Sequence, residues 1–503
     1  MEDIIELNTD QLEQPKVDDD LFANRAAVVQ MQGQTAEVSI IIQAFNRLEK
    51  TRRCVESVLK HTKTIDYELV LIDNGSTDGT LKYFKSVPCQ KKRIVHITKN
   101  VGAAYPSTVL SLIDMGKFVC IVNNDLIVTD HWLENLLACM KSDSKIGMVT
   151  PMSNNVSNDQ NVEFSYNSYE EMQRKAARIN QSDPRKWEDR LRLITIGTLY
   201  RKEALLAGGW PIFDVGFFHD FGDDDITFKI RRMGYRTVLA GDTWICHDHE
   251  FQRRDPAQYR HSLEIGKKNF TDKYYGVDAW DDVTNTYLPY LPHFPATKAA
   301  ENARILGVDV RCGTPILDMK NWLRKASIFN TVLSAFTQDP RYWLDLKTIC
   351  GGAVVCDREE FLLDAYPREY FDYVIADRPL NRYHEPQKIM SDLFALCKSG
   401  GVVTCKLKNT YSFQEYVHLL GYRDVYDDEF SYHLPVDAVR TALGKFGTVK
   451  AMMTVSFSLE EDMRGTIDSL IPAELPEDQR AELLRAMLCK EYLFVVEKHH
   501  NLN

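Results

Sequence analysis

Short apolar runs alternate with helix-length amphipathic stretches from Val38 onward, and this alternation limits what the chain can fold into more than any other feature. The first runs cover residues 38–42, 68–72, 93–97 and 118–122. Between them, residues 49–61 and 130–141 place apolar side chains on one face of a helix. Strands that alternate with helices predict βαβ units, in which a largely parallel sheet is covered on both faces.

A second series of apolar runs begins beyond a proline-rich segment at residues 285–295. Its members cover residues 305–310, 331–335, 353–356, 373–376, 401–405 and 492–496. A chain of 503 residues exceeds what one hydrophobic core usually supports. We therefore predict an α/β protein with a polar N-terminal tail at residues 1–36, a first domain at residues 37–295 and a second domain at residues 296–503.

Charge and cysteine content exclude some classes of protein. The formal net charge is −11, which disfavours binding to nucleic acid backbones. No uninterrupted apolar stretch approaches the roughly 18 residues that cross a bilayer. The eleven cysteines include no C-x-x-C pair, as is typical of buried thiols in a reducing compartment. These features predict a cytoplasmic protein with no transmembrane segment and no nucleic acid partner.

Polar side chains follow three of the runs in the first domain. They are Ala44-Phe45-Asn46, Asp73-Asn74-Gly75 and Asn123-Asn124-Asp125. Ligands of open α/β sheets bind beyond the carboxyl ends of the strands, where these segments are expected to lie. Asp125 is placed to hold a divalent cation that neutralises a leaving diphosphate. Ordinary turns and helix caps use the same residue types, so each string alone leaves both interpretations open.

Three successive carboxylates, Asp223, Asp224 and Asp225, open an amphipathic stretch farther along the chain. Helix capping accounts for one of them, because the N-terminus of a helix favours negative charge. Three indicate that at least one faces a cleft, where it can take a proton from an incoming hydroxyl. His247 and His249 follow another apolar run. They can complete the ligand set of a metal, or they are simply a pair of surface histidines.

The order and spacing of these motifs resemble those of family-two glycosyltransferases of the GT-A fold. The matching segments are residues 38–47, 73–80, 100–102, 123–125, 132–134 and 223–225. The resemblance covers about residues 37–270. It implies an inverting transferase that uses a UDP- or dTDP-linked sugar together with Mn²⁺ or Mg²⁺.

The resemblance also implies roles for individual residues. Those expected to bind the nucleotide-sugar are Ala44, Asn46, Asp73, Asn100, Asn123 and Asn124. Asp125 matches the metal carboxylate, while Asn123 replaces the first acid of the family's Asp-x-Asp motif. His247 matches the histidine that closes the metal site, with His249 as the alternative. Asp223 matches the general base, with Asp224 and Asp225 as alternatives.

The second domain resembles class I S-adenosylmethionine-dependent methyltransferases over residues 303–410. The resemblance implies a Rossmann-like sheet with Gly313 and Asp357 at the cofactor. Only one glycine remains in the first loop, and Thr337 stands where an acid normally holds the ribose. Two interpretations follow, which are methyl transfer or a degenerate scaffold for docking and homo-oligomer formation.

These motifs favour glycosyl transfer as the function of the chain. Residues 147–157 resemble a loop of bacterial transferases that glycosylate cell-surface polymers or proteins, so the expected acceptor is a surface glycan or a protein such as flagellin. The alternatives are a methyltransferase that acts on the glycan and a non-catalytic regulator that binds nucleotide-sugars. The first domain has acids at both the metal and the base positions, which places catalysis there.

Overall fold

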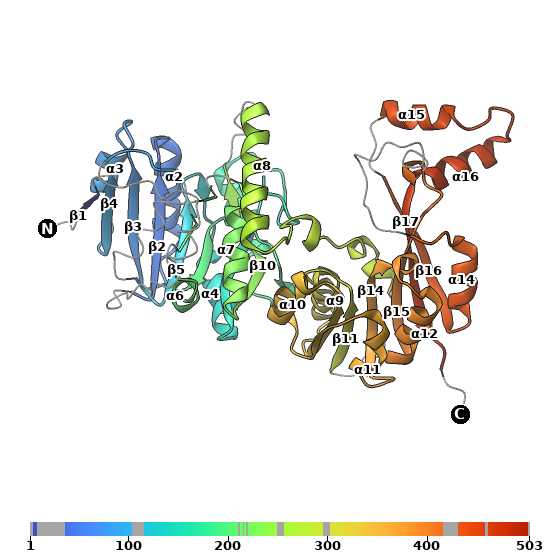
Figure 1. The fold of residues 1–503 in the computed structure, drawn as a ribbon. Coiled ribbons are helices and arrows are strands. Elements are labelled where there is room, and N and C mark those ends of the chain that lie inside the picture. The colour runs from blue at the N-terminus through green and yellow to red at the C-terminus, as the bar shows by residue number, and fades with distance from the viewer. Residues whose placement is uncertain are drawn as a thin grey trace. The chain divides into compact units, whose positions relative to one another are not determined.

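The computed structural model describes residues 4–7, 36–102, 115–209, 212–214, 216–217, 220–248, 256–294, 302–415, 431–457 and 461–500. They belong to two compact units, Met1–Val283 and Thr284–Asn503, and each unit has its own sheet (Figure 1). None of the helices in these ranges combines the length and the apolar character needed to cross a bilayer.

A mixed sheet forms the centre of the first unit. Among the described residues it has ten strands, in the order β1-β4-β3-β2-β5-β9-β7-β10-β6, with β8 paired to β10. The strands are β1 (Ile4–Leu7), β2 (Val38–Ala44), β3 (Tyr67–Asn74), β4 (Lys92–Ile97), β5 (Phe118–Asn123), β6 (Leu126–Ile127), β7 (Ile146–Ser153), β8 (Trp187–Asp189), β9 (Thr198–Arg201) and β10 (Arg236–His247).

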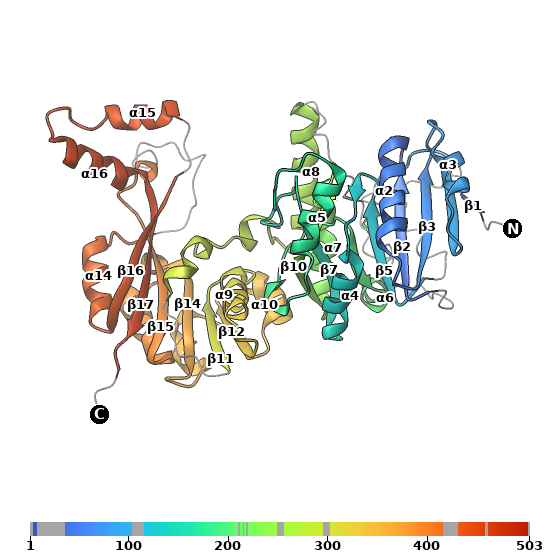
Figure 2. The ribbon, with the colours of Figure 1, turned by 180° about the vertical axis from the view of Figure 1, so that it is seen from behind.

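Helices cover both faces of this sheet, as Figure 2 shows from behind. They are α2 (Leu48–His61), α3 (Thr80–Ser86), α4 (Trp132–Ser142), α5 (Tyr169–Ile179), α6 (Lys202–Ala207), α7 (Gly222–Arg232) and α8 (Pro256–Lys273). Ile40 and Ile42 of β2 pack with α2, α3 and α4, whereas Ile41 packs with α6 and α7. Burial on both faces explains why the central strands read as continuous apolar runs.

Strand direction brings the candidate site together at one edge of this sheet. β2, β3, β4 and β5 are parallel, and β9 is antiparallel to both β5 and β7. Since β10 is parallel to β7, the carboxyl ends of β2, β3, β5, β7 and β10 share one edge. β9 runs in the opposite direction, so the residues that precede it lie at this same edge. We call it the carboxyl edge.

The N-terminal tail prediction is wrong for residues 4–7, which form strand β1. Ile4–Leu7 pairs in parallel with β4, from Ile4 opposite Ile94 to Leu7 opposite Ile97. β4 would otherwise present unpaired backbone groups, which favour the addition of another strand. A run of four residues is too short to show a period, so the sequence pattern does not reveal it. The remainder of the predicted tail up to residue 35 lies outside the described residues.

A seven-stranded sheet, counted over the described residues, forms the second unit in the order β13-β12-β11-β14-β15-β17-β16. The strands are β11 (Ala303–Val308), β12 (Thr331–Thr337), β13 (Val354–Cys356), β14 (Phe371–Pro379), β15 (Cys397–Lys408), β16 (Gly447–Ser456) and β17 (Cys489–Lys498). β11 to β15 are parallel, and β17 is antiparallel to both β15 and β16. Numbered along the chain, the order begins 3-2-1-4-5, which is that of a Rossmann-like sheet.

Seven α-helices lie between the strands along the chain in the described part of this unit. They are α9 (Thr314–Lys325), α10 (Trp343–Ile349), α11 (Leu362–Ala365), α12 (Pro386–Leu396), α14 (Val436–Gly444), α15 (Glu461–Ser469) and α16 (Glu477–Leu488). Of these, α9, α10, α12 and α14 contact the sheet directly. The proline-rich segment belongs to this unit, because Asn285 Nδ2 donates to Asp318 Oδ2 at 2.8 Å and the Tyr287 hydroxyl donates to the Ala376 carbonyl at 2.7 Å. The units therefore divide at residues 283/284, ahead of the expected boundary at 295/296.

Candidate functional site

Asp125 and His247 lie side by side at the carboxyl edge. Oδ1 of Asp125 is 3.6 Å from Nε2 of His247, and the two side chains are 10% and 12% exposed. The contact follows from strand pairing, since β6 begins directly after Asp125 and its Leu126 is the register partner of His247 in β10. The structure thus brings together the two predicted metal ligands. His249, the alternative ligand, lies outside the described residues.

Two asparagines that follow β7 hold His247 in place. The Asn154 side chain accepts a hydrogen bond from the His247 backbone N–H at 2.8 Å and donates one to the His247 carbonyl at 3.0 Å. Nδ1 of His247 lies 3.3 Å from the Asn155 carbonyl, which can only accept. A proton on Nδ1 leaves the lone pair of Nε2 directed at Asp125. This is the tautomer that ligates metals through Nε2.

The donor set at this pair fits a divalent cation that is also held by a substrate. An oxygen and a nitrogen 3.6 Å apart can be bridged by one ion, because each ligand bond is about 2.1 Å long. Within the described parts of the chain, no group of three or more His, Cys, Asp or Glu side chains could hold a metal. The remaining ligands would be water or phosphate oxygens, as is usual for Mg²⁺ at nucleotide sites. Nη1 of Arg47 also lies 3.9 Å from Oδ2 of Asp125.

The turns after β2 and β3 form the neighbouring part of the edge. Ala44 is the register partner of Asp73. Asn46 accepts a hydrogen bond from the Thr77 N–H at 2.9 Å, which ties the two turns together. Asn100 Oδ1 accepts a hydrogen bond from Asn74 Nδ2 at 3.0 Å. The predicted nucleotide-binding segments therefore lie beside one another.

Asp73 itself has no solvent-exposed surface. Its Oδ2 lies 2.8 Å from Nδ1 of His96, and its Oδ1 accepts a hydrogen bond from the Ser76 N–H at 3.1 Å. The carboxylate thus holds the turn after β3 and orients the His96 ring, which is partly exposed. Nearer the metal pair, the Asn123 side chain is exposed, whereas Asn124 donates a hydrogen bond to Thr51 of α2 at 2.9 Å.

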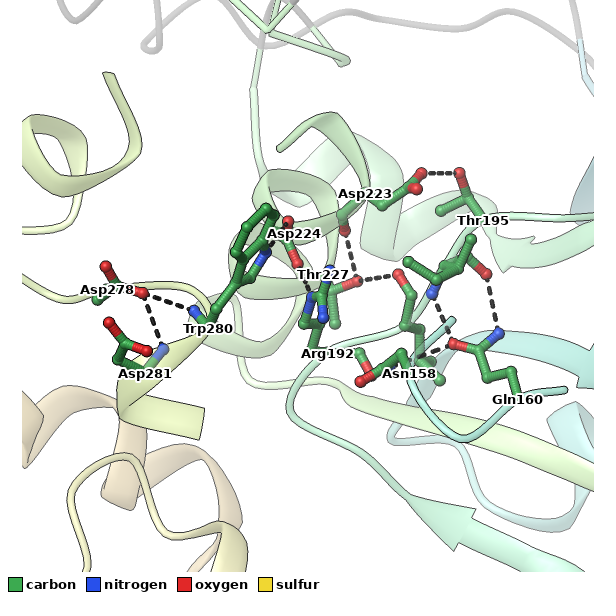
Figure 3. Close-up of polar contacts among 12 residues, drawn as sticks. Asn158, Gln160, Arg192, Thr195, Asp223, Asp224, Thr227, Asp278, Trp280 and Asp281 are labelled. Atoms are coloured by element: carbon green, nitrogen blue, oxygen red, sulfur yellow. Dashed lines mark hydrogen bonds and ion pairs between the residues drawn. The ribbon is translucent and has the colours of Figure 1, made fainter. Parts of the chain in front are cut away.

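The three consecutive aspartates of α7 have different environments, and Figure 3 shows two of them, Asp223 and Asp224. Asp224 is buried, pairs with Nε of Arg192 and accepts a hydrogen bond from Trp280 Nε1 at 3.2 Å. Asp225 is buried against Lys273, whose Nζ is 2.5 Å away. Both carboxylates are therefore engaged in ion pairs that hold α7 in the unit. Only Asp223 remains as our candidate base.

Asp223 is partly exposed, and its described side-chain partner is Thr195, whose hydroxyl donates to Oδ1. The pKa of Asp223 is raised to about 6, chiefly because the surrounding protein excludes water from the carboxyl group; hydrogen bonds from Thr195 act to lower it, and the charge of Asp224 acts to raise it. A carboxyl group with this pKa is ionised at neutral pH and remains basic enough to accept a proton. These are the properties of a general base.

Asp223 lies at the carboxyl edge because its partner Thr195 precedes β9. Between Thr195 and β9, Gly197 has a φ of +54° and packs so closely that a Cβ atom would lie 2.7 Å from Ile245 and 3.6 Å from Leu126. Leu126 directly follows Asp125, and Ile245 is two residues before His247. The candidate base and the candidate metal pair therefore belong to one edge and one region of the molecule.

Several residues of this site were not predicted from the sequence. They are Arg47, Asn154, Asn155, Gln160, Arg192, Thr195 and Trp280. Their contacts join segments that are far apart in the chain, so no local period or spacing marks them. Local motifs marked only some of them, because Arg47 belongs to the matching segment 38–47 and Asn154 and Asn155 to the resembling loop 147–157.

The cofactor residues predicted in the second unit differ in how far the structure supports them. Gly313 has a φ of +103° at the start of α9, where a Cβ atom would lie 2.4 Å from Ile349. Asp357 is exposed. The loop before Gly313 is closed, because Asp309 accepts hydrogen bonds from Gln338 N at 2.8 Å and from Gln338 Nε2 at 3.0 Å. The expected ribose position, Thr337, is buried.

Comparison with known proteins finds a family match within the first unit. Residues 39–205 match the family model described as glycosyl transferase family 2. Glycosyltransferase GlyG of Streptococcus pneumoniae is 29% identical over 101 residues, which cover 20% of this chain and 33% of GlyG. Poly(ribitol-phosphate) beta-N-acetylglucosaminyltransferase TarP of Staphylococcus aureus is 33% identical over 107 residues, which cover 20% of this chain and 32% of TarP. The matches span about a third of the length of these relatives.

Solved structures with similarity to this chain include the mannosyltransferase PcManGT from Pyrobaculum calidifontis in complex with GDP-Man and Mn²⁺. It is 20% identical and aligns over 48% of this chain and 64% of its own length, with a TM-score of 0.35. A SAM dependent methyltransferase from Archaeoglobus fulgidus is 14% identical and aligns over 46% of this chain and 98% of its own length, with a TM-score of 0.30. The family match includes Asp73, Asp125 and Thr195, and the first unit of this chain therefore carries a glycosyl transferase family 2 domain.

Proposed function

We propose that this chain is an inverting glycosyltransferase that moves a sugar from a UDP- or dTDP-linked donor to a hydroxyl group. The observation that carries the proposal is the shared location of Asp223 and the Asp125–His247 pair at the carboxyl edge of a family 2 domain. One acid is set to accept a proton, and the other belongs to a pair that fits a divalent cation. Inverting transfer from a nucleotide-sugar needs a base for the acceptor hydroxyl and positive charge beside the leaving diphosphate.

The chemistry assigns separate roles to the two acids. Ionised Asp223 takes the proton of the acceptor hydroxyl as its oxygen attacks the anomeric carbon. The attack comes from the face opposite the diphosphate, so the new C–O bond forms as the bond to the leaving oxygen breaks and the configuration inverts. Asp125 and His247 would hold Mn²⁺ or Mg²⁺, which supplies positive charge beside the diphosphate. Arg47, 3.9 Å from Asp125, adds a fixed cation at this position.

The acceptor we propose is a hydroxyl of a surface glycan or of a protein such as flagellin. The names of several relatives support a polymeric acceptor. Besides TarP, they include chondroitin synthase of Escherichia coli, 29% identical over 126 residues, and hyaluronan synthase of Pasteurella multocida, 27% identical over 259 residues. All eleven cysteines are free, as in a reducing compartment, and we therefore place the reaction in the cytoplasm.

We assign the second unit a scaffold role, in docking or homo-oligomer formation. Asp309 and Gln338 join the two loops between which S-adenosylmethionine would bind, and burial raises the pKa of Asp309. Val310 and Cys312 of the first loop are buried as core residues. These contacts do not favour the alternative of methyl transfer. They leave catalysis to the first unit.

A ligand screen followed by a turnover assay tests the proposal. A panel of UDP- and dTDP-sugars with Mn²⁺ is expected to contain one donor that selectively raises the melting temperature. At a hundredfold excess over Kd, such a donor stabilises the folded protein by about 2.7 kcal/mol. The wild-type protein should release nucleoside diphosphate from that donor. Selective binding without any release would instead favour the non-catalytic regulator.

A further inference from the structure

One loop reaches both sides of the candidate site. It follows β7 and comprises residues 154–160. At its start, Asn154 makes two hydrogen bonds to the backbone of His247. At its end, Asn158 donates a hydrogen bond to the Arg192 carbonyl at 2.7 Å, and Gln160 forms hydrogen bonds with Ile194. The loop therefore contacts the metal side of the site with one end and the base side with the other.

Gln160 holds the residue that precedes Thr195. Its Oε1 accepts a hydrogen bond from the Ile194 N–H at 2.6 Å, and its Nε2 donates to the Ile194 carbonyl at 3.1 Å (Figure 3). The Gln160 side chain has no exposed surface. A buried amide that satisfies both backbone groups of one residue fixes the orientation of that residue. These two hydrogen bonds therefore also fix the position of the next residue, Thr195.

The position of Thr195 determines how Asp223 is presented. The Thr195 hydroxyl donates to Oδ1 of Asp223, and Arg192 of the same segment pairs with Asp224 of α7. Helix α7 is also fixed independently of this segment, because Lys273 pairs with Asp225. Thr227 of α7 also donates to the Leu193 carbonyl at 3.4 Å. The segment from Arg192 to Thr195 is thus held to the loop on one side and to α7 on the other. We call residues 192–195 the strap.

We infer that Gln160 is a positioning residue for the base, acting through the strap and the Thr195 hydroxyl on Asp223. The inference rests on the proposed function and adds a residue to it. Gln160 is completely buried, so it acts on the base through the strap and not through contact with substrate. Asn154, at the other end of the loop, serves the metal side in the same manner. The two ends can therefore be separated by experiment.

Loss of the bond from Thr195 has a defined effect on the pH dependence of transfer. The other charged and titratable groups that act on Asp223 are Asp224 and Arg192, together with Tyr200 of β9. Neither a substitution at Gln160 nor one at Thr195 removes any of these three groups. A hydrogen bond to the ionised carboxylate lowers its pKa, so removal of the bond raises it. The acidic limb of the kcat profile should then move to higher pH.

Four variants separate positioning from folding. Gln160→Leu removes both bonds to Ile194, and Gln160→Glu removes the donor. Thr195→Val removes the hydroxyl, and Thr195→Ser retains it. We expect Gln160→Leu and Thr195→Val to lower kcat by roughly tenfold to a hundredfold, as misplaced catalytic groups do, and to shift the acidic limb upward without a comparable change in donor KM. Thr195→Ser should restore the wild-type profile. Gln181→Leu, a surface glutamine bonded only within its own segment, is the matched control.

Metal dependence provides the second readout. Asn154→Ala should raise the Mn²⁺ concentration needed for half-maximal activity and leave the acidic limb in place, the reverse of Gln160→Leu. If Gln160→Leu fails to fold, the comparison of Thr195→Val with Thr195→Ser decides in its place. Wild-type kcat and an unmoved acidic limb in folded Gln160→Leu or Thr195→Val, with Asp223→Asn inactive, would overturn this inference alone. Activity in Asp223→Asn would overturn the proposed function itself.

Discussion

Oδ1 of Asp125 lies 3.6 Å from Nε2 of His247, although the two residues belong to segments far apart in the sequence. The pairing of β6 with β10 creates this contact, and the Asn154 side chain fixes the His247 backbone. Two oriented donors are too few to hold a cation tightly by themselves. They suit a cation that arrives with a diphosphate.

Removal of the Asp125 carboxylate tests the metal site. We expect Asp125→Ala to bind UDP with the same affinity in Mn²⁺ and in EDTA, because the ion no longer links protein and diphosphate. Wild-type protein should bind more tightly in Mn²⁺. Isothermal titration calorimetry measures the UDP affinity of each protein in Mn²⁺ and in EDTA. Asp66→Ala, an exposed acid paired with Lys91, is the control. An Mn²⁺-dependent gain that persists in Asp125→Ala would exclude this carboxylate as a ligand.

The ion pairs at Lys273 test whether Asp225 is structural. Lys273 is 8% exposed and lies 2.5 Å from both Asp214 and Asp225. Lys273→Met leaves two buried carboxylates without their cation, which should cost about 3–5 kcal/mol and lower the melting temperature by roughly 6–20 °C. Lys268→Met, which breaks an exposed pair in the same helix, should change stability by less than about 1 kcal/mol. Equal effects of the two variants in calorimetric melting would contradict the structural role.

The strands could be predicted well where both faces of the sheet are buried. β2, β3, β4 and β5 each begin within one residue of the predicted run, because a strand covered by helices needs apolar residues at nearly every position. β16 was not predicted, since its residues alternate between exposed and half-buried and give no apolar run. β1 was missed because four residues show no pattern.

The site could be predicted only in part, for a related reason. Asp125, His247 and Asp223 stand at or next to the ends of strands or at the start of a helix, and the local hydrophobic pattern reveals these ends. Thr195 and Gln160 do not, because their function arises from contacts between β7, the strap and α7 that only the fold creates. The choice among the three aspartates likewise depends on the distant partners Arg192 and Lys273.

Asp223 should make the folded protein less stable at neutral pH. Its pKa of about 6 in the folded state is above the ordinary value of 3.8, so the folded state holds this proton more tightly than the unfolded state does. The contribution of protonated Asp223 to the stability of the folded state is complete below pH 3.8 and is lost as the pH rises through 6. Asp223→Asn should therefore raise the free energy of unfolding at pH 7.5 by up to roughly 3 kcal/mol, and by little at pH 4. Urea denaturation at both pH values measures this, and a variant that is less stable at pH 7.5 would argue against the raised pKa.

S-adenosylmethionine binding tests the scaffold role of the second unit. Gln338 is bonded to Asp309, and Thr337, which stands at the position expected for the acid that holds the ribose, is buried. We expect calorimetry with micromolar to millimolar S-adenosylmethionine to show no saturable heat. Micromolar binding that disappears in Asp357→Ala would establish a cofactor site and overturn the scaffold role.

Turnover of Asp223→Asn tests the central claim most directly. With the donor selected by thermal shift, Mn²⁺ and an acceptor at pH 7.5, the release of nucleoside diphosphate by wild type and variant is compared together with donor affinity. Loss of a general base should slow release by about 10²- to 10⁴-fold while donor affinity stays unchanged. Release at the wild-type rate by folded Asp223→Asn would contradict the account.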